Sequence, residues 1–322
     1  MKSHSSKIKQ FLLLLLKLII VGTAFYFMYS QMNKKELNWS LFSHVLGTPK
    51  SGMLFTALLI LTFLNRFLEI LKWKNLAKVL GPISTWESTK QVLTGITFGI
   101  VTPNGIGEYA GKAWFYPRSE AGKVVFLNIV CNGIQVLFAV FFGLLGTLYV
   151  NLLHRFIPGY YLVLFFGVLA IAVFILFYIK DFQIKGLSLQ NFFSSLNKIP
   201  AGIHQKNILL ALLRYLVLLH QYFILYKLFQ VDIPYMVLMA VVACIYLLAS
   251  SLPNFQALDF ALKGGIAVYL LGFFGVEGWV VPIVATCIWL LNLVIPVSIG
   301  SILLLLFNPK KKQSLHSDET AL

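Results

Sequence analysis

A succession of apolar stretches constrains this chain more than any other feature, because each is long enough to cross a bilayer core of about 30 Å. Only 11% of the 322 residues are charged, against roughly 25% in soluble domains, and the mean hydropathy is +0.83. These values exclude a soluble globular enzyme and predict an all-α polytopic membrane protein. Seven stretches are predicted as spans, at 10–30, 52–71, 122–150, 160–179, 207–229, 235–252 and 279–307.

Two further stretches, 92–116 and 256–276, are apolar but contain proline, glycine and ionisable residues. Each is predicted to be a short interrupted helix or a re-entrant hairpin. If 92–116 enters and returns while 256–276 crosses, the chain has about eight transmembrane helices. We expect one transmembrane domain over 1–309 and a basic, polar tail over 310–322, with the stretch at 10–30 retained as an uncleaved anchor.

The distribution of positive charge predicts the orientation. The net charge of +15 lies in segments between apolar stretches, which is typical of a membrane protein and argues against a nucleic-acid partner. With the N-terminus inside, sixteen Lys and Arg fall in cytoplasmic segments and four in outside loops. The rule that positive loops stay inside therefore places both termini on the cytoplasmic side of a bacterial-type cytoplasmic (inner) membrane.

No signature of a catalytic or cofactor site is present. Cys131, Cys244 and Cys287 lie inside apolar stretches without CxxC spacing, which predicts neither disulfides nor a metal site. There is no HExxH, no GxSxG, and no true phosphate-binding loop. We therefore expect no cofactor and name no catalytic residue.

The first interrupted stretch carries the strongest functional signal. Its proline and glycines stop a helix and expose backbone groups, which a membrane tolerates only where protein or a watery cavity satisfies them. A new helix starting near Gly105 would place Glu108 four residues before Lys112 on one face, the favourable order for an ion pair. The candidate substrate-binding residues here are Pro103, Asn104, Gly105, Gly107, Glu108 and Lys112.

The second interrupted stretch repeats this pattern about 150 residues later. Pro253 and Asn254 are followed by Asp259 and Lys263, again an acid four residues before a base. Paired interrupted segments in two halves of a membrane protein indicate a transport site at a repeat interface, here a weak internal repeat. The alternative is that each pair only neutralises two charges that are expensive in a bilayer.

Further polar residues lie within the apolar stretches. Arg66, three residues before Glu69, is a candidate binding residue or a side chain that reaches the membrane surface. Arg214 is a candidate phosphate ligand or an interfacial anchor. A polar stripe at Asn128, Asn132 and Gln135 indicates either hydrogen bonds between helices or part of a site.

These features resemble one known family. Pro103, Gly105, Gly107 and Glu108 after a short apolar helix, the break at Leu252 and Pro253, and about eight spans are similar to the transmembrane region of lysylphosphatidylglycerol synthases, a flippase-like domain. The resemblance implies movement of aminoacylated phospholipids between leaflets. Two departures are the missing aminoacyl-transferring domain, which makes lysyl transfer unexpected, and a second break with no glycine-rich turn.

The sequence therefore predicts a lipid translocator. Its partners would be anionic or aminoacylated phospholipid head groups, with Lys112, Lys263 and either Arg66 or Arg214 on the phosphate. Glu108 and Asp259 would balance charge or contact a cationic head group. The alternatives are a membrane partner that presents lipid to a separate lipid-modifying enzyme, and an intramembrane enzyme that uses Glu108 as a base.

Overall fold

The structure is a computed structural model that describes residue 26 and residues 49–100, 102–161, 164, 167, 189–252 and 255–306. Within these residues the chain is helical and contains no named strand. The predicted spans at 10–30 and over most of 160–179, the Pro253–Asn254 break and the tail at 310–322 lie outside the described residues, so the count of eight spans is not confirmed.

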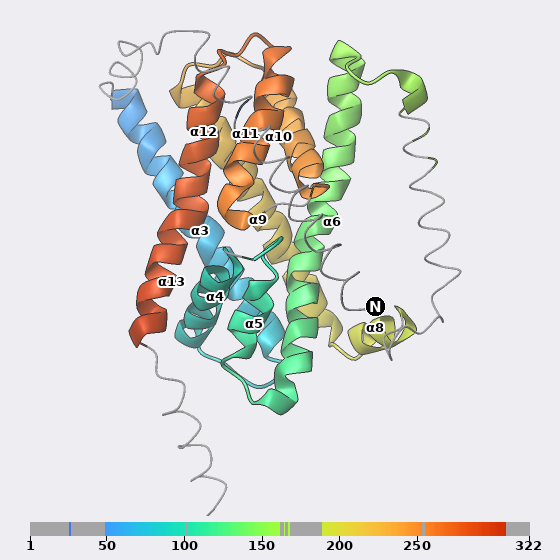
Figure 1. Ribbon diagram of the computed structural model, residues 1–322, viewed down its shortest axis with the longest axis vertical. Helices are drawn as coiled ribbons and strands as arrows, with labels where there is room; N and C mark the ends of the chain where they lie inside the picture. The colour runs from blue at the N-terminus through green and yellow to red at the C-terminus, as the bar shows by residue number, and fades with distance from the viewer. Residues whose placement is uncertain are drawn as a thin grey trace, which may run out of the picture.

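Four long helical runs form the frame of the molecule (Figure 1). Each has at least 27 residues and is long and apolar enough to cross a membrane, since 27 residues rise about 40 Å. Helices of this kind indicate a membrane protein. The four runs are α3 (Pro49–Ala77), α6 (Ala121–His154), α9 (Ala201–Leu228), and α12 (Val280–Trp289) continued by the π-helical turn η3 (Leu290–Val294) and α13 (Ile295–Leu306).

A first helical hairpin consists of α4 (Thr85–Gly99) and α5 (Gly107–Ala113), and the η1 turn (Arg118–Glu120) then leads into α6. Its arms pack so closely that a Cβ at Gly107 would overlap the carbonyl oxygen of Phe98. Two residues of α6 bond to the ion pair of α5: Asn128 accepts from Lys112, and Asn132 donates to Glu108. The tip of this hairpin therefore lies beside the middle of α6.

The backbone groups at the break between the arms form hydrogen bonds within the break itself. The Thr102 hydroxyl donates to the Gly99 carbonyl oxygen at 2.8 Å and accepts from the Gly107 N–H at 2.8 Å. The N–H of Gly105 bonds to the Thr102 carbonyl oxygen at 3.2 Å. The prediction of a helix break followed by a new helix that pairs Glu108 with Lys112 is confirmed.

A second helical hairpin consists of α10 (Tyr235–Ser250), η2 (Gln256–Leu258) and α11 (Asp259–Gly272). Gly146 and Gly143 of α6 lie against Ala240 and Leu247 of α10. Because α10 runs antiparallel to α6, its C-terminal end reaches the middle of α6 from the opposite end.

This arrangement differs from the expectation that 235–252 and 256–276 each cross the membrane. Helices of 16 and 14 residues rise only about 24 and 21 Å, less than a bilayer core of about 30 Å. The helix ends at Ser250, and the chain turns back through α11, which packs against α12. The short α8 (Leu189–Asn197) lies at the end where α9 begins.

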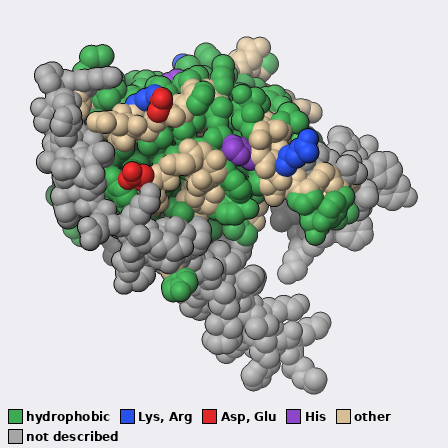
Figure 2. Space-filling view, turned by 90° about the horizontal axis from the view of Figure 1, so that it is seen from above, with side chains coloured by type: hydrophobic (Ala, Val, Ile, Leu, Met, Phe, Trp, Pro, Cys, Tyr) green, Lys and Arg blue, Asp and Glu red, His purple; other side chains and the backbone are tan. Residues whose placement is uncertain are grey.

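The two tips touch. Pro103 and Phe255 form an isolated antiparallel β-bridge, and the Ala257 N–H donates to the Ile100 carbonyl oxygen at 3.3 Å. Gly105 has a left-handed φ of +70°, and a Cβ there would lie 3.0 Å from Nε2 of Gln256. Figure 2 views the end from which the second hairpin enters, where the charged side chains visible among the described residues are scattered.

Candidate functional site

A cavity of about 400 Å³ lies where the hairpin tips meet, and its walls also include α3, α6, α9 and η3. Seven of the ten predicted site residues line it: Arg66, Asn104, Gly105, Glu108, Arg214, Asp259 and Lys263. The other three lie beside it. Pro103 holds the contact between the tips, Gly107 permits the packing of α4 on α5, and Lys112 is buried behind Glu108.

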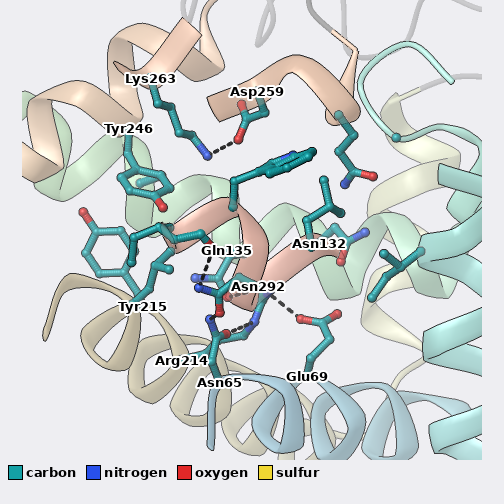
Figure 3. A pocket seen from close by; sticks show the side chains of 18 of the residues that line it. Asn65, Glu69, Asn132, Gln135, Arg214, Tyr215, Tyr246, Asp259, Lys263 and Asn292 are labelled. Atoms are coloured by element: carbon teal, nitrogen blue, oxygen red, sulfur yellow. Dashed lines mark hydrogen bonds and ion pairs between the residues drawn. The ribbon is translucent and has the colours of Figure 1, made fainter. Parts of the chain in front are cut away.

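The second hairpin presents its ion pair to the cavity (Figure 3). Lys263 Nζ lies 2.5 Å from Asp259 Oδ2, and the side chains are 20% and 28% exposed. The same ammonium lies 4.3 Å from the ring centroid of Tyr246, a cation–π contact. Both charges line the cavity, so the absence of a glycine-rich turn does not remove Asp259 from the site.

The first hairpin encloses its ion pair. Lys112 Nζ lies 2.7 Å from Glu108 Oε1, donates to Asn128 Oδ1 at 2.7 Å, and sits 4.5 Å from the Trp73 ring centroid. The Lys112 side chain has no exposed area, and only Glu108 of the pair lines the cavity. An ammonium has three donors, and here its surroundings are filled by protein.

A third charged group connects α3 with α9. Arg214 lies 2.8 Å from Glu69, and its Nε donates to Asn65 at 2.9 Å. Lys72 lies 3.2 Å from the same carboxylate. Arg66 donates to the backbone carbonyl oxygen of Asn292 in η3.

Both arginines are therefore cavity residues. The interpretations of Arg66 as a side chain reaching the surface and of Arg214 as an interfacial anchor do not agree with these positions. The helices are longer than the apolar stretches in the sequence, since α3 continues to Ala77 and α9 begins at Ala201. Each arginine therefore lies more than ten residues from the nearer helix end.

An amide network below the cavity holds these charges in place. Asn65 donates to Asn292 at 2.6 Å, Asn292 donates to Gln221 at 3.1 Å, and Gln221 donates to Thr62 at 2.8 Å. Asn292 lies in the π-helical turn, a geometry often found at functional sites. Sequence reasoning missed Asn65 and Asn292. A single asparagine in a long apolar stretch was the available signal, since an unpaired amide is costly in hydrocarbon.

The polar stripe of α6 forms hydrogen bonds between helices. Asn128 accepts from Lys112, Asn132 donates to Glu108 at 3.4 Å, and Gln135 accepts from Arg214 at 3.4 Å. The stripe thus connects α6 to the first hairpin and to α9. Asn132 and Gln135 also line the cavity, so both interpretations of the stripe apply.

No group of three His, Cys, Asp or Glu suited to a metal is found within the described part of the chain. The three cysteines are free. The cavity is lined by three carboxylates and three cationic side chains together with amides and hydroxyls, a set that suits a polar or charged ligand held by hydrogen bonds and charge.

Comparison with protein-family models and with curated proteins finds no match for this chain. The resemblance to the transmembrane region of lysylphosphatidylglycerol synthases therefore stays a prediction.

Proposed function

We propose that this protein moves a lipid between the two leaflets of a membrane, with the lipid head group passing through the cavity at the hairpin tips. One observation carries the proposal. Two hairpins enter the helical frame from opposite ends, and both contribute charged residues to one polar cavity at mid-depth. Interrupted helices that meet near the membrane midplane are how many transporters build their substrate sites.

The position of the cavity beside an exposed apolar surface favours a lipid over a soluble solute. A cavity of about 400 Å³ is at the small end of ligand pockets, so a head group fits while acyl chains, which fill half of a bilayer core, do not. Val136 of α6 lines the cavity and also belongs to an exposed stripe with Ile129 and Leu137. We infer that the cavity opens beside this stripe, where the acyl chains stay in the bilayer.

Two contacts identify the parts that would move. Among the described residues, the tips meet through a β-bridge and a hydrogen bond at 3.3 Å, whereas the arms of the first hairpin interlock through glycines. We propose that each hairpin moves as a unit and that the tips separate to open the cavity alternately to the two ends. We also propose that the protein lies in the cytoplasmic membrane with both termini on the cytoplasmic side.

The test is leaflet exchange in liposomes that contain the purified protein. Phospholipids labelled on the head group are placed in both leaflets, and a membrane-impermeant quencher reports the fraction that crosses. We expect exchange with wild type and a loss of about tenfold with Arg214→Gln, which removes one charge-assisted contact of roughly 1.5 to 3 kcal/mol. Arg118→Gln, an exposed arginine in η1, is the matched control.

Other outcomes separate the alternatives. A lipid product of changed mass would indicate an intramembrane enzyme. Folded protein that exchanges no lipid would contradict translocation and favour a partner that presents lipid to a separate transferase.

A further inference from the structure

The charge balance around the cavity bears on which lipid would fit. The described charged residues that line the cavity, or that form an ion pair with a lining residue, include three acids: Glu69, Glu108 and Asp259. Five bases accompany them: Arg66, Lys72, Lys112, Arg214 and Lys263. The residues that line the cavity balance, three acids against three bases, so the net charge of +2 for the whole cluster comes from Lys72 and Lys112, whose side chains are fully buried beside Glu69 and Glu108.

Uncompensated charge at the centre of a bilayer is expensive, and such residues usually mark a substrate path. Two of the bases are arginines, which remain protonated in proteins. Arg214 has Glu69 at 2.8 Å, but Lys72 lies 3.2 Å from the same carboxylate, and Arg66 bonds to a backbone carbonyl. One carboxylate thus faces several cations.

Unused hydrogen-bond donors provide a second, independent observation. Arg66 Nε, Trp289 Nε1 and the Tyr215 hydroxyl are buried, belong to residues that line the cavity, and have no hydrogen-bond partner in the described structure. Outside the ion pairs, one lining acceptor, Oε1 of Gln256, is in the same state, so such donors outnumber acceptors three to one. A buried donor without an acceptor costs roughly 1 to 3 kcal/mol. Donors without acceptors, beside excess positive charge, suit a ligand that carries acceptor oxygens and two negative charges.

We propose, building on the translocator function, that the head group recognised here is a phosphate monoester at the end of a lipid. A monoester carries a charge of about −1.5 to −2 at pH 7 and three strong acceptor oxygens, whereas a phosphodiester carries a single negative charge. The monoester neutralises the cluster, a phosphodiester leaves it positive, and an aminoacylated cationic head group adds to the imbalance. Arg66, Arg214 and Lys263 are the charged side chains placed to hold it.

Binding to the full-length purified protein tests the proposal separately from transport. The probes are dihexanoyl phosphatidic acid as the monoester, dihexanoyl phosphatidylglycerol as the matched phosphodiester, and inorganic phosphate. We expect the monoester lipid to bind at least about tenfold more tightly than the phosphodiester, the effect of one additional charge-assisted contact. Equal affinity, or a preference for the phosphodiester, would overturn the proposal.

Inorganic phosphate separates a lipid head group from a free anion. It should bind more weakly than the monoester lipid because it has no acyl chain to lie beside α6. Equal binding of the two would overturn the assignment to a lipid.

Variants test the residues. Arg66→Gln should reduce the preference for the monoester to a few-fold, while Arg118→Gln should leave it unchanged. Tyr215→Phe removes only a hydroxyl that has no partner among the described residues, so it should leave the unfolding temperature of the free protein the same or higher and weaken monoester binding several-fold. If both Arg66→Gln and Tyr215→Phe kept the full preference for the monoester, the assignment of the binding site to this cavity would be contradicted. If Arg66→Gln does not fold, Tyr215→Phe alone provides the test.

Leaflet exchange with long-chain versions of both lipids then distinguishes the two proposals. Exchange of the phosphodiester at the same rate as the monoester would overturn the preference and leave translocation standing. Tight monoester binding without any exchange would overturn translocation and leave the charge-based assignment of the site standing.

Discussion

The two hairpins carry the same arrangement of charges, an acid four residues before a lysine, and use it differently. In the first hairpin, Lys112 is fully buried, with Asn128 and the Trp73 ring completing its surroundings. In the second hairpin, Lys263 and Asp259 retain 20% and 28% exposure and line the cavity. The difference lies in what packs around each pair, and not in the spacing of the residues.

This contrast assigns different tasks to similar residues. A buried pair that is broken leaves an uncompensated charge, whereas a partly exposed pair can exchange its partner for a ligand at lower cost. We infer that the first pair fixes its hairpin against α6 and that the second pair meets the substrate. The following substitutions test this difference, beginning with the largest expected effect.

Lys112→Met should destabilise the protein most. It removes the cation paired with the largely buried Glu108, and breaking a buried pair in this way costs roughly 3 to 5 kcal/mol. The unfolding midpoint in detergent measures the loss. Lys123→Met is the control, because Lys123 is 68% exposed and pairs with Glu120 at the surface; equal stability of the two variants would contradict a structural role for Lys112.

Gly107→Ala should destabilise the first hairpin by about 3 kcal/mol, at the upper end of overpacking costs, because the new Cβ would overlap the Phe98 carbonyl oxygen. Gly133→Ala is the matched control. Gly133 lies in the middle of α6 with nothing within 4 Å of its Cβ position, so alanine there should leave stability the same or slightly higher. Thermal unfolding of both variants gives the comparison, and a loss at Gly133 equal to that at Gly107 would contradict close packing as the cause.

Lys263→Met should cost only about 1 kcal/mol of stability, because the pair is partly exposed. Its larger effect should be on leaflet exchange, which we expect to fall about tenfold from the loss of one charged contact with the phosphate. Exchange rate and unfolding midpoint are measured on the same preparation. If Lys263→Met lost as much stability as Lys112→Met and kept a normal exchange rate, the roles assigned to the two pairs would be contradicted.

The lengths of the apolar stretches and the composition predicted much of this architecture. The apolar stretches correspond to α3, α6, α9 and the run from α12 to α13, and the helix break before Glu108 follows from Pro103 and two glycines. The sequence also identified seven residues that line the cavity. These features depend on local chemistry, which a single sequence displays.

The second hairpin could not be distinguished from two crossings. Counting Lys and Arg in loops cannot separate them, because the connection from Ser250 to Gln256 contains neither residue. Both arrangements also return the chain to the same end before α12. Only packing shows that α10 stops halfway along α6, where glycines admit it. The convergence of Asn65, Gln221 and Asn292 was hidden for a related reason, since their positions are 71 or more residues apart.

The smallest expected effect comes from exchanging the two charges of the second hairpin, Asp259→Lys with Lys263→Asp. The pair is retained, so the cost should be about 0.5 kcal/mol, from a cation in the first turn of α11 and the less favourable order of an i,i+4 pair. The same exchange in the first hairpin, Glu108→Lys with Lys112→Glu, is the contrast. It places a carboxylate over the Trp73 ring, whose face attracts cations, and should cost several times more. Unfolding midpoints of the two double variants measure the difference, and equal losses would show that enclosure by packing does not distinguish the two pairs.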